Sequence, residues 1–514
     1  MVQDISNAYS PPPLSFRDCL VDGRIDVARY MVYSQSLQYD EETDHLEELI
    51  RSNKTKRDNE SSVFSSNKKA RNVSRSIKRH PILCRADDGT LREATHEDST
   101  WFRLYIETPP VRERLLKQFR KRFRLPYNDF ISLCNDLKTH EFFHRWSYED
   151  AVGVKASDIR LLLLGTLRYL GRAHTFDDAC ESTFISADVH RVFFMAFIEY
   201  GSTVLYEKHV MSPLKTMDMS RIEKLFNIAG FNVCIGSSDG THIGMLCCPS
   251  WAFHNHKGFK LAIPSRNYNA TVTHWRQIMG TTFGHPGTYN DKTLVLFDDL
   301  IKNTHDGKWL QDKQFELLEL DRDGNIIPVI YLGAWFLVDN GYLEWSTTVP
   351  PLKHPLTYEE IRFSEWLESM RKDIECTFGI MKQRFHVLKH GIRLHVIANS
   401  DKVWSTCCAL HNMLLFLDGL DKGWEDFSKD TKKLGMEIPF SMQRLNRHED
   451  SVVINPGTEY GPDYFEKYMI KGKRIVRKLP LHVFQERLVH HFDIRFKTNE
   501  LAWPKRKERQ CKVY

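Results

Sequence analysis

The chain has 514 residues, of which 41% are hydrophobic and 12% aromatic, so it can bury a core in two or more domains. No apolar stretch approaches the roughly 20 residues that span a bilayer, and the first residues lack the apolar segment of a secretory signal. We therefore expect neither membrane insertion nor secretion. The eleven cysteines follow no regular spacing, which favours free thiols in a reducing compartment.

Residues 1–80 are predicted to be a disordered basic region. Residues 51–80 hold ten Lys and Arg against two acids, although the whole chain has a formal net charge of only +5. Such clusters attract nucleic acid through counterion release, while a solvated tail is the plainer alternative. The strings Lys68-Lys69-Ala70-Arg71 and Lys78-Arg79 are candidate nuclear-import signals, so we expect a nuclear protein. A second basic run begins at Lys505.

Residues 100–225 are predicted to form a helical, DNA-binding domain. Apolar residues such as Phe119, Phe123 and Phe130 recur at helical spacing. Within it, residues 175–197 suggest two short helices separated by a tight turn, with Ser186 capping the second. This pattern is typical of a helix-turn-helix, and equally of an ordinary helical bundle.

From residue 231 the pattern changes to short apolar strands and then a long helix. We expect strands at residues 233–236, 268–274, 277–283 and 335–338, and a charged loop insertion at 303–329. The long helix is predicted from Thr357 to about residue 388, with Glu360 completing a capping box and Leu356 and Ile361 forming a hydrophobic staple. Strands followed by helices predict an α/β fold, a mixed sheet flanked by helices.

Three acids stand at the ends of these elements. Asp239 follows a strand and precedes Gly240, which we expect to let the chain turn away. Asp291 follows a glycine-containing loop, and Glu375 lies near the edge of the long helix's apolar face. Each alone is more often a surface acid.

Together, three carboxylates can hold two divalent ions. Mg²⁺ and Mn²⁺ prefer oxygen ligands, and a pair of them can activate a water or a 3′-hydroxyl and stabilise the leaving oxygen of a phosphodiester. We assign Asp239 as the bridging ligand, with Asp291 and Glu375 on either side. Without metal, repulsion should make one of the acids hold its proton near neutral pH.

Six segments together resemble the PIF/Harbinger transposases, and they occur in the same order. They are Ser238-Asp239-Gly-Thr-His-Ile243, His254-Asn-His-Lys-Gly-Phe259, Gly284-His-Pro-Gly-Thr-Tyr-Asn-Asp291, Val338-Asp-Asn-Gly-Tyr342, Glu375-Cys-Thr-Phe-Gly-Ile-Met-Lys-Gln-Arg-Phe385 and Cys407-Cys-Ala-Leu-His-Asn412.

The resemblance implies a DDE nuclease domain with a ribonuclease-H-like fold at residues 230–420, followed by a C-terminal extension at 421–514. Asp239, Asp291 and Glu375 match the family's catalytic triad, and Asp339 matches a further acidic position that would join them as a metal ligand. It also implies two Mg²⁺ or Mn²⁺ ions, double-stranded DNA as substrate, and a separate Myb-like DNA-binding partner, and it allows an oligomer. The chain departs from the family at Asp339, whose neighbours differ, and at His256, where an Arg is common.

Basic residues near these motifs are candidate phosphate ligands. Lys257, Arg371, Lys382 and Arg384 could contact DNA, or form an ordinary solvated surface. Cys247, Cys248, His254 and His256 have zinc-ligand side chains, but adjacent cysteines rarely ligate one ion, so we do not expect zinc.

The sequence therefore predicts a metal-dependent DNA endonuclease or transposase that cuts phosphodiester bonds and can transfer strands. A domesticated, catalytically silent DNA-binding or scaffold protein is the alternative, and a nuclease without a transposon is a third.

Overall fold

The computed structural model describes residues 83–85, 88–146, 156–310, 312–320, 323–424 and 479–503. It also gives the backbone of two short strand pairs, β1 (Leu20–Val21) with β2 (Arg24–Ile25) and β13 (Met469–Ile470) with β14 (Lys473–Arg474). The chain divides into two compact units, residues 1–80 and 81–514, and the second contains the central sheet and its helices. The predicted import strings and the C-terminal basic run lie outside the described residues. In the described part, no helix is both long and apolar enough to cross a membrane.

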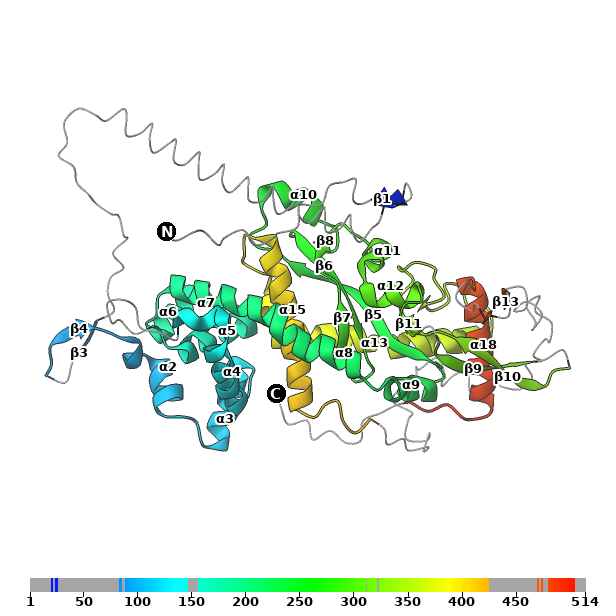
Figure 1. Ribbon diagram of the computed structural model, residues 1–514, viewed down its shortest axis with the longest axis horizontal. Helices are drawn as coiled ribbons and strands as arrows, with labels where there is room; N and C mark the ends of the chain where they lie inside the picture. The colour runs from blue at the N-terminus through cyan, green and yellow to red at the C-terminus, as the bar shows by residue number, and fades with distance from the viewer. Residues whose placement is uncertain are drawn as a thin grey trace, which may run out of the picture. The chain divides into compact units, whose positions relative to one another are not determined.

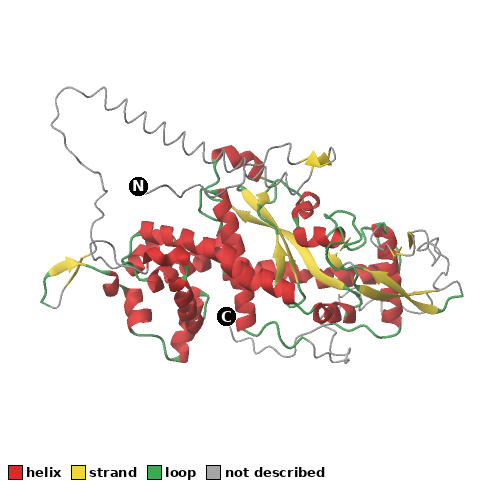
Figure 2. Ribbon diagram, in the orientation of Figure 1, coloured by secondary structure: helices red, strands yellow, loops and turns green. Residues whose placement is uncertain are grey.

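The centre of the second unit is a mixed sheet (Figures 1 and 2). Its strands follow the order β12-β11-β5-β6-β7, and β8 pairs with β6 beside this path. β11 is parallel to both β12 and β5, whereas β6 is antiparallel to β5, β7 and β8. The bounds are β5 (Cys234–Gly244), β6 (Ser265–Val272), β7 (Ile278–Thr281), β8 (His285–Pro286), β11 (Trp335–Leu337) and β12 (Thr348–Val349). The predicted α/β class, a mixed sheet with helices, is confirmed.

A group of helices precedes the sheet, as predicted. They are α2 (Thr100–Phe102), α3 (Glu113–Phe123), α4 (Tyr127–Thr139), α5 (Ile159–Arg172), α6 (Phe176–Thr183), α7 (Ala187–Tyr200), α8 (Ser212–Thr216) and α9 (Met219–Ile228), with π-helical turns at Arg103–Glu107, Gly201–Leu205 and Glu207–Met211. Phe119, Phe123 and Phe130 are fully buried or nearly so, which explains their spacing. Ser186 caps α7 by accepting a hydrogen bond from the backbone N–H of Val189, as expected.

One long helix, α15 (Ile397–Leu417), joins the helical group to the sheet (Figure 1). It packs against α7 and the π-helical turns on one side and against β7 on the other. A single cluster of buried apolar side chains accordingly includes residues from the helical group, the sheet and α15. The predicted division near residue 230 is therefore bridged by continuous packing.

The predicted loop insertion at 303–329 is wrong. α12 (Asp299–His305) enters this stretch, and β9 (Gln314–Leu320) and β10 (Ile326–Leu332) form an antiparallel hairpin. Alternate residues of β9 are buried, because the helix α18 (Leu481–Lys497) packs against it. A strand that alternates charged and apolar residues has one dry face, which its overall polarity conceals.

The long helix begins as predicted and ends sooner. α13 (Tyr358–Arg384) starts at Thr357 with the expected capping box to Glu360. The chain leaves helical geometry at Phe385 and resumes as α14 (His386–His390). The expected staple is absent, since the Leu356 side chain is 88% exposed.

We predict that Gly165→Ala destabilises the helical group by about 1–3 kcal/mol, the usual cost of overpacking. Gly165 lies in the buried α5, where a Cβ would stand 2.6 Å from Nδ1 of the buried His190. Urea unfolding followed by circular dichroism measures the change.

Gly379→Ala is the matched control, because Gly379 also lies within a helix but a Cβ there meets nothing within 4 Å. It should stabilise by about 0.5–1 kcal/mol. Equal effects of the two substitutions would contradict the packing argument.

Candidate active site

Asp239 lies within β5, and Asp339 follows the end of the neighbouring parallel strand β11. Leu337 of β11 is the register partner of Ser237 of β5, and each aspartate stands two residues further on. The expected turn at Gly240 is wrong, because β5 continues to Gly244. Parallel pairing thus brings together two acids that are a hundred positions apart.

Asp291 reaches the same place from a third segment. It begins the short helix α11 (Asp291–Leu294), which Asn290 caps. A Cβ on Gly240 would lie 2.7 Å from Asp291 Oδ1, and one on Gly341 would lie 3.1 Å from Asp291 Oδ2 and 2.9 Å from Asp339 Oδ1. Gly240 and Gly341 are therefore the positions where the absence of a side chain lets the aspartates approach one another.

Glu375 joins the group through an arginine. α13 packs against β5, and the Arg371 guanidinium lies between the two elements. Its NH2 is 2.8 Å from Glu375 Oε1, and its NH1 is 3.4 Å from Asp239 Oδ2. Glu375 remains 47% exposed, at the edge of the buried face, as predicted. The structure thus brings three aspartates together and connects the glutamate to them by a shared cation.

Burial and repulsion both raise the pKa values of these acids. The pKa of Asp239 rises to about 6, chiefly because of burial and further because of Asp339 and Asp291, while Arg371 and the Gly240 N–H oppose the rise. Burial also raises the pKa of Asp291, and Asp339 adds to it, against the opposing Lys260. One carboxyl therefore titrates near neutral pH, as the sequence suggested, although burial contributes more than repulsion.

A layer of buried polar side chains forms hydrogen bonds beside the acids. Asn269 of β6 donates to Ser238 Oγ at 3.0 Å and to Asp298 Oδ2 at 2.7 Å, and its Oδ1 accepts from the Tyr342 hydroxyl. Ser238 precedes Asp239 in β5, and Tyr342 follows Asp339 in its loop. This layer ties the two acid-bearing segments to β6.

The sequence analysis missed this layer and Lys260, whose Nζ is 3.6 Å from Asp291 Oδ2. Tyr342 could have been found, because it ends the motif that contains Asp339. Asn269 gave no signal, since one polar residue in an apolar strand does not reveal its partners.

The predicted phosphate ligands have different surroundings. Lys257 is exposed. Lys382 donates to Thr241 Oγ1 at 2.9 Å, and burial lowers its pKa. Arg384 is buried, with NH1 3.4 Å from the carbonyl oxygen of His411, so a phosphate contact would require it to leave the interior. Arg371 is engaged by Asp239 and Glu375.

His256 has a structural environment rather than that of a zinc ligand. Its Nδ1 is 2.9 Å from the Ala252 carbonyl oxygen, and its Nε2 is 3.2 Å from NH1 of Arg266. Among the described residues, no group of three or more His, Cys, Asp or Glu, the four acids above included, is arranged to hold a metal ion without a shift of side chains. The cysteines in that part of the chain are free thiols.

Residues 208–419 match the family described as plant transposon protein. The chain is related to transposases. The matched span starts in the second of the adjacent π-helical turns and ends just after α15, so it contains the sheet and all four acids. No curated protein and no solved structure gave a match to this transposase-related protein.

We predict that Asp239→Asn stabilises the metal-free protein at pH 7.5 by about 1–3 kcal/mol. The folded pKa of about 6 exceeds the ordinary value near 3.9, so the folded state binds more protons between the two. The stability that this extra proton binding contributes is lost as the pH rises through 6. Asparagine carries no charge, so the variant does not suffer this loss. Unfolding in EDTA at pH 7.5 and 4.5 should show a gain that shrinks at the lower pH.

Asp401→Asn is the control, because Asp401 accepts from Arg266 at 2.5 Å and from the Tyr268 hydroxyl at 2.8 Å. Removing this charge should destabilise by roughly 3–5 kcal/mol. A loss of stability for both variants at pH 7.5 would refute the idea that Asp239 is held at an energetic cost.

Proposed function

We propose that this transposase-related protein is a metal-dependent DNA endonuclease of the DDE type. The observation that carries the proposal is the meeting of Asp239, Asp291 and Asp339, from three separate segments, at one end of the sheet. Holding like charges together is costly, and a divalent cation is the partner that would offset the cost.

The donor atoms suit Mg²⁺ or Mn²⁺. All are carboxylate oxygens, the ligands that these hard cations prefer. Asp291 Oδ1 is buried and accepts no hydrogen bond among the described residues, which leaves a strong acceptor for an ion. Two ions here would act as Lewis acids on a phosphodiester and lower the pKa of an attacking water.

The residues of the chain then have distinct roles. Asp239, which pairs with Arg371 and is acted on by both Asp339 and Asp291, is the proposed bridging ligand, and Asp291, Asp339 and Glu375 would hold the ions with it. Arg371 balances Asp239 and Glu375 in the metal-free protein. Once their charge is neutralised, its guanidinium donors become available to the oxygens of a DNA phosphate.

The finer assignments rest on the same site. The sheet, with β11 and β12 parallel to β5 and β6 antiparallel to it, supports a ribonuclease-H-like domain. Strand transfer by a freed 3′-hydroxyl, nuclear localisation and a Myb-like partner follow from the likeness to PIF/Harbinger transposases and remain part of the proposal.

We predict that the wild type nicks supercoiled plasmid in Mg²⁺ or Mn²⁺ and that EDTA abolishes nicking. Asp239→Asn, Asp291→Asn and Glu375→Gln should each reduce the rate at least a hundredfold, because each removes a charge that holds an ion, an effect of about 3 kcal/mol or more. Agarose gels of time courses give the rates.

Asp401→Glu serves as the control for general damage, because it keeps a carboxylate outside the acidic site. Duplex binding by all variants should remain near wild type. A wild type that binds duplex DNA but never nicks it would favour the silent, DNA-binding or scaffold alternative.

We also predict that Mn²⁺ raises the melting temperature of the wild type more at pH 7.5 than at pH 5.0. Ions bind the deprotonated acids, and with a pKa of about 6 Asp239 is mostly protonated at pH 5.0. Asp239→Asn should lose most of the shift at pH 7.5. Differential scanning fluorimetry measures it, and a shift independent of both pH and Asp239 would place the ion elsewhere.

A further inference from the structure

Basic side chains from three helices meet at a surface away from the acidic site. The C-terminal ends of α3 and α5 and the short α14 contribute to it. We call it the three-helix basic surface and define it by Arg122, Arg124, Arg168, Arg172, His386 and Lys389. None of these residues is among the candidate phosphate ligands of the sequence analysis.

Contacts between the helices fix this arrangement. Both α3 and α14 pack against α5. Arg168 of α5 donates from NH1 to the Arg122 carbonyl oxygen at 3.3 Å. A Cβ on Gly171 would lie 2.9 Å from Cγ of Arg124, so the Arg124 side chain lies directly across the end of α5.

Helix dipoles account for only part of this charge. Each helix C-terminus carries roughly half a negative charge, so three ends offset about 1.5 positive charges. Five side chains of the surface are arginine or lysine. Among the described residues, no carboxylate forms an ion pair with Arg122, Arg168, Arg172 or Lys389. The carboxylate of Asp178 lies 3.9 Å from Nδ1 of His174, which is not one of these four side chains. A net positive charge therefore remains.

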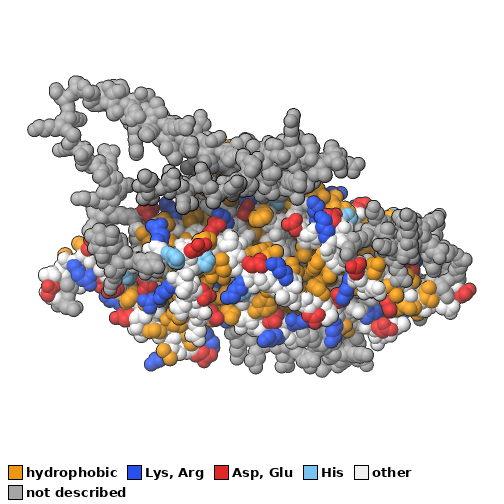
Figure 3. Space-filling view, in the orientation of Figure 1, with side chains coloured by type: hydrophobic (Ala, Val, Ile, Leu, Met, Phe, Trp, Pro, Cys, Tyr) orange, Lys and Arg blue, Asp and Glu red, His pale blue; other side chains and the backbone are white. Residues whose placement is uncertain are grey.

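The cations lie close enough to repel one another. Burial first, and then Arg172, Arg122 and Arg124, lower the pKa of Arg168. Burial, Arg124 and Arg172 likewise lower the pKa of His386. On the face in Figure 3, basic and acidic side chains are interspersed.

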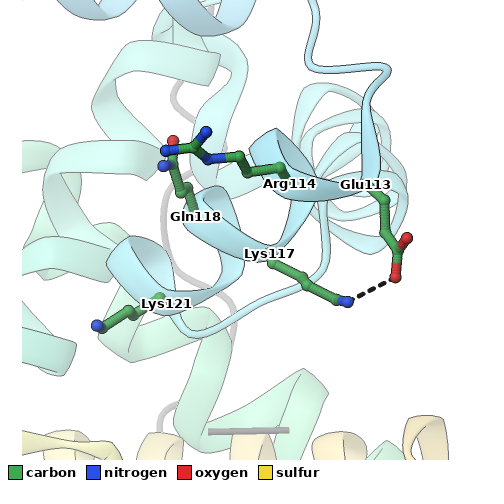
Figure 4. A pocket seen from close by; sticks show the side chains of 5 residues that line it. All are labelled: Glu113, Arg114, Lys117, Gln118 and Lys121. Atoms are coloured by element: carbon green, nitrogen blue, oxygen red, sulfur yellow. Dashed lines mark ion pairs between the residues drawn. The ribbon is translucent and has the colours of Figure 1, made fainter. Parts of the chain in front are cut away.

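The exposed side of α3 extends the basic character. Arg114, Lys117 and Lys121 line a shallow pocket of about 410 Å³ (Figure 4). Lys117 is paired with Glu113 at 2.5 Å, while Arg114 and Lys121 have no such partner in the figure. By contrast, α6 carries Asp177, Asp178 and Glu181 and no basic residue, which makes the α6–α7 pair a poor phosphate surface.

α13 connects this surface to the acids. From Glu375 to Arg384, where α13 ends, the helix rises roughly 14 Å, at 1.5 Å per residue, and α14 begins at His386. Half a turn of duplex DNA spans about 17 Å. A duplex with one phosphate at the acids can therefore place backbone phosphates half a turn away at the end of α13.

We propose that the three-helix basic surface binds the phosphate backbone of duplex DNA, independently of sequence, beside the site of cutting. The position of this surface relative to the cut rests on the proposed nuclease function. The choice of DNA as its partner rests on charge. The α6–α7 pair is not the main phosphate contact.

The test is binding of the full chain to a fluorescent 30-base-pair duplex, without divalent ions, at several salt concentrations. Arg172→Gln with Lys389→Gln removes two exposed cations from α5 and α14. The slope of log K against log salt should become shallower by about two, and affinity near 0.1 M salt should fall roughly ten- to a hundredfold. The control, Lys208→Gln with Lys353→Gln, removes the same charge from exposed positions elsewhere, of which Lys353 lies 3.8 Å from Glu344, and should leave the slope close to that of the wild type.

Circular dichroism checks that both double variants fold. A third variant, Arg172→Lys with Lys389→Arg, keeps both charges and should therefore show the slope of the wild type. An unchanged slope in the first variant, equal losses in the control, absent duplex binding by the wild type, or stronger binding to phosphatidylserine vesicles would overturn the inference. If the wild type nicks plasmid but Arg172→Gln with Lys389→Gln leaves the salt dependence of binding unchanged, only the proposed role of the three-helix basic surface is refuted. A wild type that never nicks, with the predicted loss of slope, refutes only the nuclease function.

Discussion

The burial of three neighbouring aspartates is the constraint around which this end of the sheet is built. Asp239, Asp291 and Asp339 come from different segments, and their mutual repulsion adds to the cost of burying their charges. The fold offsets the repulsion with Arg371 and Lys260, and it makes room for the carboxylates by placing glycine at two nearby positions. An arrangement of this kind lowers stability, and natural proteins keep such arrangements mainly where they bind or react.

The rest of the unit holds the acids in place. The layer around Asn269 ties β5 and the Asp339 loop to β6. β6 is also fixed to α15 by Arg266 and Tyr268, which both donate hydrogen bonds to Asp401. Because α15 also packs against the helical group, the sheet and the helices form one packed body. A duplex gripped by the ends of α3, α5 and α14 would therefore be held in a fixed relation to the acids.

Much of the local structure could be predicted from sequence. The start of α13, the cap of α7 and the strands around Asp239 follow from residue patterns that act over a few positions. The errors came where neighbours distant in sequence decide the outcome. β9 looked like a loop because the stretch is rich in charge, but α18 covers one face of the strand, where Glu319 is buried and pairs with Arg487. Gly240 looked like a turn, but Asp291 explains why no side chain stands there.

The sequence by itself determined which acids to consider and which elements carry them, because strand and helix patterns and capping residues are local. Tertiary structure alone decided how the acids meet. Parallel pairing of β5 with β11 brings the segment that carries Asp339 beside Asp239, Arg371 places a cation between Asp239 and Glu375, and Arg384 turns inward. Register and side-chain burial depend on packing between segments a hundred residues apart, and no local pattern encodes them.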